Sequence, residues 1–222
     1  MAKLTFWGAA QQVTGSCHLL ETAHGRLLLD CGLFQGTPDT EKLNERPFPF
    51  DPGKIDAVVL SHAHLDHSGL LPKLTAAGFS GPVYLTPATH DLVELMLKDA
   101  AFLEMKDNQW ENKRRQRSGK DPVEPLYTLD DVERVLAQRS PLDYGVRLEI
   151  LPGIGLRFHQ GGHILGASFV EITIEQNDHG NPHRTTLVFS GDLGNCFSPL
   201  MQDPAPPPPA DVLLLESTYG DR

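Results

Sequence analysis

Cysteines are scarce in this sequence, and long apolar segments are missing from it. Cys17, Cys31 and Cys196 are too few and too scattered for a disulfide framework or a thiolate zinc site, so we expect reduced, buried thiols. No apolar run reaches the roughly 20 residues that a membrane-spanning helix needs, and residues 1–7 lack the apolar core of a signal peptide. These absences predict a cytoplasmic protein without a membrane partner.

Positive charge is also in short supply. The 19 lysines and arginines are outnumbered by 29 acidic residues, which leaves a net charge of −10. Because phosphate binding depends on clustered basic side chains, this balance excludes a surface that coats nucleic acid generally. One segment, 106–120, is locally basic, and its simplest interpretation is a solvated helix face that leads into a polar loop. Its charged residues are Lys106, Lys113, Arg114, Arg115, Arg117 and Lys120 against Asp107 and Glu111.

The 222 residues are enough for one well-packed core. Strand patterns open the chain, helical patterns occupy its middle, and strand patterns return from Gly145 onward. Two strand-rich blocks around a helical middle predict two stacked αβ halves. The expected strands are 3–9, 17–22, 26–29, 57–60, 83–86, 146–151, 156–159, 167–175, 185–189 and 212–215, and the expected helices begin at 87–89 and at 128.

Two stretches read as irregular structure. Residues 36–53 are rich in proline, glycine, aspartate and asparagine and predict a long loop. Residues 204–209 contain five prolines in six positions, a stiff segment of the kind that marks a domain boundary. We therefore predict one domain over 1–203 and a segment, 204–222, that leads out of it.

Ligand-type side chains gather at the end of the apolar strand 57–60. Three histidines and one aspartate fall within six positions there, and imidazole nitrogen and carboxylate oxygen are the donors that Zn²⁺ takes. His62 and His64 are two apart, so in extended backbone both side chains leave on the same side. Asp66 and His67 fall at the start of a helical pattern and would point from an offset position, which indicates two neighbouring metals. A lone histidine is more often structural.

Two further strands end in such residues. His163 lies among glycines in the segment 161–168, where the backbone can approach a metal closely. Asp192 follows the apolar run 187–189 and could bridge two cations through its two oxygens. Each alone would more often be a loop residue, but beside the 62–67 motif we favour the ligand role. Asp30, at the end of strand 26–29, fits either a turn or an acceptor that orients a metal-binding histidine. His90 opens a helix, and we interpret it as structural.

The pattern His-X-His-X-Asp-His resembles the signature of the metallo-β-lactamase superfamily. Further motifs narrow the resemblance to the β-CASP nucleases and, within them, to the RNA-processing branch. That branch includes the endonuclease of eukaryotic messenger 3′-end cleavage and its prokaryotic relatives. The similarity runs over essentially the whole chain. The motifs that carry it are Thr14-Gly15-Ser16, His62 to Gly69, Gly162 to Ser168, Ser190 to Gly194 and Glu216-Ser217-Thr218-Tyr219-Gly220.

The resemblance implies a fold and a set of roles. The fold is an α/β (α+β) αββα sandwich, with two mixed β-sheets flanked by helices and an incomplete C-terminal part. Two Zn²⁺ ions are implied, with Asp192 as the bridge between them. Asp66 would also orient the attacking water, and Glu216 would orient a histidine that protonates the leaving group. Asp30 becomes the acceptor that orients a ligand. The implied ligands are His62, His64 and His163 for one zinc, and Asp66 and His67 for the other.

Three functions stay open at this point. In the family a β-CASP domain and a last zinc-binding histidine follow the Glu-Ser-Thr-Tyr segment, so we expect this chain to be the front part of such an enzyme. The first interpretation is a zinc-dependent ribonuclease, an endonuclease that cleaves single-stranded RNA. The second is a hydrolase of a small ester, thioester or lactam. The third is a partner subunit that binds RNA or a longer paralogue without cutting. The oligomeric state stays open between a monomer and a homo-oligomer.

Overall fold

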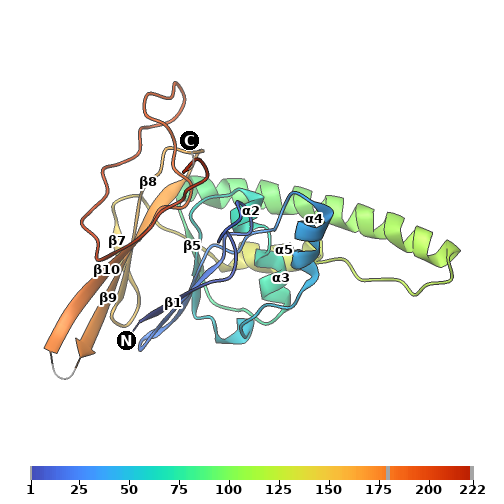
Figure 1. Ribbon diagram of the computed structural model, residues 1–222, viewed down its shortest axis with the longest axis horizontal. Coiled ribbons are helices and arrows are strands. Elements are labelled where there is room, and N and C mark those ends of the chain that lie inside the picture. Colours follow the sequence, from blue (N-terminus) through green and yellow to red (C-terminus); the bar gives the residue numbers. More distant parts are fainter. Residues whose placement is uncertain (1, 179–180, 221–222) are drawn as a thin grey trace.

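Two mixed β-sheets stacked face to face form the body of the protein, and helices cover one side of the stack (Figure 1). The computed structural model describes residues 2–178 and 181–220. The first sheet has the order β1 (Lys3–Phe6), β2 (His18–Thr22), β3 (Gly25–Leu29), β4 (Ala57–Val59), β5 (Val83–Leu85) and β6 (Arg139–Pro141). The second has the order β11 (Val212–Leu214), β10 (Asn181–Phe189), β9 (Ser168–Asp178), β8 (Ile154–Gln160) and β7 (Arg147–Leu151).

Both sheets are mixed, as the fold class predicts. In the first sheet β1, β2 and β3 pair antiparallel, whereas β3, β4, β5 and β6 pair parallel. In the second sheet β7 to β10 pair antiparallel and β11 lies parallel to β10. Strand β11 belongs to the segment 204–222, so part of that segment is built into the second sheet.

Alternation along the strands assigns the two faces of the first sheet. Leu27 and Leu29 point into the core between the sheets, where they meet Leu156 and Val170 of the second sheet. Leu28, between them, packs on the opposite side among the residues of the helices. A period of two is what a strand imposes on its side chains, so apolar residues at consecutive positions place β3 between two apolar layers.

The helices fall on the outer side of the first sheet (Figure 1). The long helix α4 (Pro87–Arg117) begins after Thr86, whose hydroxyl accepts from the backbone N–H of Thr89. Helix α5 (Leu129–Gln138) begins with a capping box between Thr128 and Asp131. The shorter helices are α1 (Pro38–Glu41), α2 (Leu65–Ser68) and α3 (Leu71–Ala76), with the 3₁₀ turns η1 (Lys42–Glu45) and η2 (Pro52–Lys54).

Three of the four layers of an αββα sandwich are formed by residues 2–178 and 181–220. Within that part of the chain no helix follows α5, and no helix covers the outer face of the second sheet. Several predictions were wrong. Cys196 is exposed and not buried. The predicted loop 36–53 contains α1 and η1, and strand β6 was not predicted. Strand β10 begins at Asn181 and not at 185, and strand β1 ends at Phe6 and not at residue 9. Ala9 and Gln11 have positive φ values of 47° and 61°, a conformation that ends a strand. None of the described helices is long and apolar enough to cross a membrane.

Candidate metal centre

Loops from both sheets meet at one end of the sandwich. Strands β3, β4 and β5 are parallel, so their carboxyl ends lie at the same edge, and β4 leads there into His62 and His64. From the second sheet, β8 leads into the glycine-rich loop with His163, and β10 leads into Asp192. Two contacts hold these loops together: the Ser168 hydroxyl donates to the carbonyl of Ser61 at 2.9 Å, and the N–H of Gly194 donates to that of Gly161 at 2.9 Å.

Three imidazoles and one carboxylate converge in the first ligand group. His62 Nε2 lies 3.0 Å from His64 Nδ1, and His163 Nε2 lies 3.2 Å from the same His64 nitrogen. Asp192 Oδ2 lies 3.5 Å from His163 Nε2 and 3.8 Å from His62 Nε2. One donor atom from each of the four residues falls within 4.8 Å of the others. The structure therefore brings together side chains from three loops that are up to 130 positions apart in the sequence.

The donor set fits a tetrahedral metal. Nitrogen ligands about 2.0–2.1 Å from zinc stand about 3.3 Å apart at the corners of a tetrahedron, close to the observed nitrogen separations. The tautomer of His62 is suited to this role as well. Ser61 Oγ donates to Asp30 at 2.9 Å and lies 3.0 Å from His62 Nδ1, so it can accept the Nδ1 proton and leave the Nε2 lone pair for a metal.

His67 and Asp66 form a second candidate ligand group, which shares Asp192 with the first. Asp192 Oδ1 lies 3.2 Å from His67 Nε2, while its Oδ2 faces the first group. Asp66 Oδ2 lies 3.8 Å from the same nitrogen of His67. Both residues come from the short helix α2, which begins directly after His64. One carboxylate thus presents one oxygen to each group, which is the arrangement that a bridging ligand requires.

Asp30 is the buried anchor beneath both groups. Its carboxylate accepts from the Ser61 backbone N–H at 2.8 Å, from the Ser16 hydroxyl at 3.1 Å and from His67 Nδ1 at 2.6 Å. The residue is fully buried and has a φ of +57°, a conformation that aspartate tolerates better than most side chains. Because Asp30 accepts a hydrogen bond from His67 Nδ1, the ring is held with its Nε2 atom toward Asp192.

The pKa values of His62, His64, His67 and Asp192 are shifted by burial and by neighbouring side chains. Burial and the neighbouring His67 lower the pKa of His62, and burial and His163 lower the pKa of His64. Burial also acts to lower the pKa of His67, but Asp30 and Asp192 outweigh it and raise that pKa to about 10. Burial acts to raise the pKa of Asp192, yet the hydrogen bond from His67 brings it down to about 2. His62 and His64 therefore favour the neutral imidazole, which is the form that binds metals.

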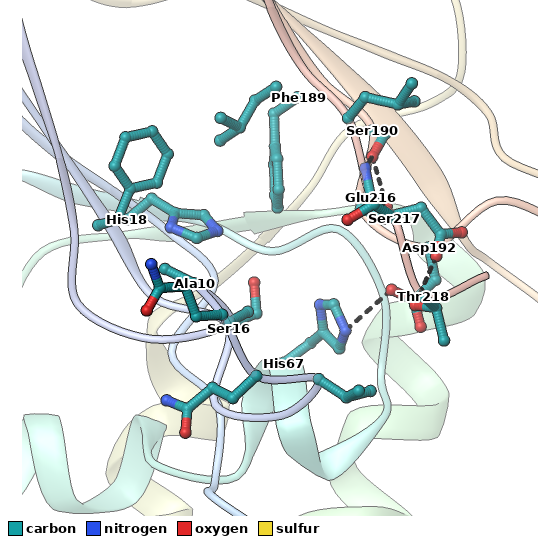
Figure 2. Close-up of a pocket in the computed structure, with 18 residues that line it drawn as sticks. Ala10, Ser16, His18, His67, Phe189, Ser190, Asp192, Glu216, Ser217 and Thr218 are labelled. Atoms are coloured by element: carbon teal, nitrogen blue, oxygen red, sulfur yellow. Dashed lines mark hydrogen bonds and ion pairs between the residues drawn. The ribbon is translucent and has the colours of Figure 1, made fainter. Parts of the chain in front are cut away.

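Glu216 lies beside the centre and contacts the backbone that carries Asp192. Its Oε1 accepts from the N–H of Leu193 at 2.7 Å, and its Oε2 accepts from the Thr218 hydroxyl at 2.8 Å. Its own N–H donates to the Ser190 hydroxyl at 2.9 Å (Figure 2). Among the described residues these contacts include no histidine, so the orientation of a histidine by Glu216 stays a prediction. Through its hydrogen bond from Leu193, Glu216 stabilises the turn that carries Asp192.

His90 lies outside both ligand groups. Its ring nitrogen Nδ1 lies 3.0 Å from Asp91, its neighbour in sequence, and its carbonyl accepts from the Arg139 guanidinium at 2.5 Å. These are contacts within α4 and to strand β6. The structural interpretation of His90 agrees with this position.

A cavity of about 600 Å³ opens next to His67 and Asp192 (Figure 2). His18 lines it and is buried between Phe6 and Phe189, whose rings meet it edge to face. Within the described residues the Nδ1 atom of His18 has no hydrogen-bond partner, and burial lowers its pKa. We did not single out His18 from the sequence. Its only signal there was its place two residues after the Thr14-Gly15-Ser16 turn.

Gly194 is a position where the two ligand-bearing loops touch. A Cβ at this residue would lie 1.8 Å from the carbonyl oxygen of Gly162, so one loop must shift. We expect Gly194→Ala to displace His163 from Asp192 and to weaken metal binding by about 10-fold or more, as the loss of a supporting contact does at other metal sites. The affinity can be measured by competition with a chelating dye.

The matched control is Gly53→Ala. At Gly53 the nearest atom to an added Cβ is Asp51 Oδ1 at 3.4 Å, which is ordinary contact. This variant should bind the metal as the parent does. Parental affinity in Gly194→Ala would show that the loop contact does not hold the site.

The sequence profile of the Metallo-beta-lactamase superfamily matches residues 11–177. The chain therefore belongs to the metallo-beta-lactamase superfamily, as its His-X-His-X-Asp-His motif predicted. Within this superfamily, the group of His62, His64, His163 and Asp192 is a candidate site for a metal ion.

Two relatives show where within the superfamily the chain is similar. It is 45% identical to the protein named ribonuclease TTHA0252 of Thermus thermophilus over 216 residues, which are 97% of this chain and 43% of that protein. It is 33% identical to transcription termination factor FttA of Methanocaldococcus jannaschii over 219 residues, 98% of this chain and 31% of that protein. The chain thus spans less than half the length of either relative.

Among solved structures, the chain matches the metallo-beta-lactamase fold protein YhfI of Bacillus subtilis. It is 18% identical to this chain and has a TM-score of 0.47, and the match covers 86% of this chain and 62% of that one.

Proposed function

We propose that this chain carries the catalytic metal centre of a β-CASP ribonuclease that cleaves single-stranded RNA with two zinc ions. The observation that carries the proposal is Asp192, which presents one oxygen to the His62, His64 and His163 group and the other to His67. The similarity to a protein named a ribonuclease supports RNA as the substrate. Zinc is favoured by the three imidazoles and by the tetrahedral spacing of the nitrogens.

The roles of the residues follow from this geometry. Two zinc ions bound there would supply a hydroxide at neutral pH and positive charge for the phosphoryl oxygens. Asp66 lies at the edge of the second group, where its carboxylate can accept a proton from the attacking water and hold its lone pair toward phosphorus. Asp30 keeps His67 oriented, and Glu216 keeps the Asp192 turn in place. The negative net charge of the chain would repel RNA phosphates only weakly at the site, because bound zinc ions would make the site locally positive.

The domain boundaries remain proposals. We propose that residues 1–203 form the metallo-β-lactamase part, and that 204–222 leads toward the β-CASP part of a longer protein. The share of the relatives that this chain covers supports the idea of a longer protein.

The function is tested by RNA cleavage. The zinc-loaded chain is expected to cut a uniform-sequence single-stranded RNA with labelled ends, and a chelator such as EDTA should stop the reaction. Elemental mass spectrometry should give about two zinc ions per chain, the number that the two ligand groups imply. Competing cleavage of a thioester in the same tube separates the second interpretation from the first.

Two results would favour a different function. Thioester turnover without RNA cleavage would replace the ribonuclease by a small-molecule hydrolase of the same superfamily. Two bound zinc ions with neither activity would favour the non-cutting partner subunit.

A further inference from the structure

One face of the outer half of α4 is exposed and unusually rich in aromatic and basic side chains. Trp110 is 77% exposed, and Phe102 and Leu103 are about half exposed. At 3.6 residues per turn these three positions lie on the same side of the helix as four basic residues. We name this surface the α4 stripe; it consists of Phe102, Leu103, Lys106, Trp110, Lys113, Arg114 and Arg117.

The opposite side of the helix is occupied, which fixes how α4 is rotated. The side chain of Asn112 donates to the carbonyl of Val123 at 2.8 Å and accepts from the N–H of Val123 at 2.7 Å. Glu104 accepts from the N–H of Leu126 at 2.8 Å, and Arg115 donates to the carbonyl of Asp121 at 2.5 Å. The chain after the helix therefore runs back along one side of α4, and the stripe faces solvent.

The cations of the stripe are largely free of acidic partners. Lys106 Nζ lies 4.3 Å from the centre of the Phe102 ring, a cation–π contact. Arg114 pairs with Glu111 at 2.8 Å. In the described part of the chain no ion pair joins Lys113 or Arg117 to a carboxylate. A tryptophan flanked by such cations matches a base that stacks and phosphates that need neutralising.

We propose that the α4 stripe binds the single-stranded RNA substrate outside the metal centre, with a base stacked on Trp110 and phosphates held by Lys113 and Arg117. The inference rests on RNA being the substrate. It names a contact surface that the metal centre does not include, and it reverses the simpler interpretation of the basic segment as a solvated helix face.

The position of the stripe suits such a strand. Helix α4 begins at the metal centre, because the hydroxyls of Thr86 and Thr89 donate to the carbonyl of Gly166 in the loop of His163. From Thr89 to Trp110 the helix rises by roughly 30 Å. Its outer half projects away from the sheets (Figure 1). A single strand of RNA can lie along the projecting helix without contacting the acidic body of the protein. A flat anionic membrane would instead be repelled by the whole net charge of −10.

The experiment measures binding without cleavage. A labelled single-stranded oligouridylate, long enough to span the helix and the site, is titrated with the full chain in EDTA and followed by fluorescence anisotropy at several salt concentrations. We expect Trp110→Ala to raise the dissociation constant at least about fivefold, since stacking on one aromatic ring accounts for that much or more. Trp110→Phe should retain most of the affinity, because a ring remains for stacking.

The charges are tested by a double variant. Lys113→Gln with Arg117→Gln should make the salt dependence shallower by about 1.4 in the slope of log affinity against log salt, because each phosphate contact on a single strand contributes about 0.7. The matched control is Lys42→Gln with Lys54→Gln, which removes the same charge from exposed positions elsewhere. It should leave the slope close to the parental value.

Three results would overturn the proposal. They are parental RNA affinity in Trp110→Ala, an equal change of slope in both double variants, and a parental chain that dimerises through α4 and becomes monomeric in Trp110→Ala. The last would assign the stripe to a second copy of the chain. A parent that binds RNA through the stripe but does not cut it with zinc would overturn the proposed function, while the stripe would still be shown to bind RNA.

Discussion

Replacing Asp30 by alanine is expected to lower the free energy of unfolding by about 3–5 kcal/mol, the usual effect of removing one partner of a buried ion pair. The carboxylate is fully buried and accepts from Ser61, Ser16 and His67. Alanine would leave these donors without an acceptor and would also have to adopt the positive φ of 57°. Urea unfolding of the metal-free chain, followed by circular dichroism, measures the change.

Two further variants sharpen this test. Asp39→Ala removes a carboxylate that is 92% exposed and, among the described residues, forms an ion pair only with Lys42, so it should change stability by less than about 1 kcal/mol. Asp30→Asn keeps the volume but replaces one acceptor oxygen with a donor, and it should fall between the two. If Asp30→Ala lost no more stability than Asp39→Ala, Asp30 would not be the anchor of the centre.

The second large effect is expected for His64→Ala. His64 Nδ1 is the atom on which His62 and His163 converge, at 3.0 and 3.2 Å. Its removal leaves the first group with two imidazoles and a carboxylate. We expect zinc affinity at that group to fall by more than about 100-fold, because the loss of an orienting partner alone costs about 10–100-fold. The zinc-to-protein ratio after dialysis should fall by about one, as measured by elemental mass spectrometry.

The control for this variant lies on the same chain. His90 is a histidine at the start of α4 whose ring contacts Asp91 and not the ligand groups. His90→Ala should keep the parental zinc content. Equal zinc loss in His64→Ala and His90→Ala would mean that the ligands are misassigned.

The fold was largely predictable because its strands and helices carry strong local signals. Consecutive leucines in β3 and the apolar run of β4 indicate buried strands, and the hydroxyl of Thr128 marks the start of α5. The end of β1 was missed, because positive φ values at Ala9 and Gln11 come from the turn around them and not from their side chains.

The candidate metal ligands could be chosen from the sequence, but the residues that hold them in place could not. Three histidines and an aspartate within six positions are a rare combination, so their ligand chemistry can be read from spacing alone. Ser61 and Ser16 are ordinary residues in sequence, and only the structure shows that both donate to Asp30. His18 became visible only where it lines the cavity beside His67.

The sequence by itself determined which side chains are available for metal binding, and a resemblance between motifs was enough to name the superfamily. Tertiary structure decided how they act together. His163 and Asp192 come from the second sheet, and they meet the first sheet's histidines only because the two apolar faces pack and bring the strand ends to one edge. The same holds for α4: the chain from Asp121 to Leu126 covers one side of the helix and leaves Trp110 and its basic neighbours to the solvent. Local spacing sets the chemistry of a side chain, whereas long-range packing sets what that side chain faces.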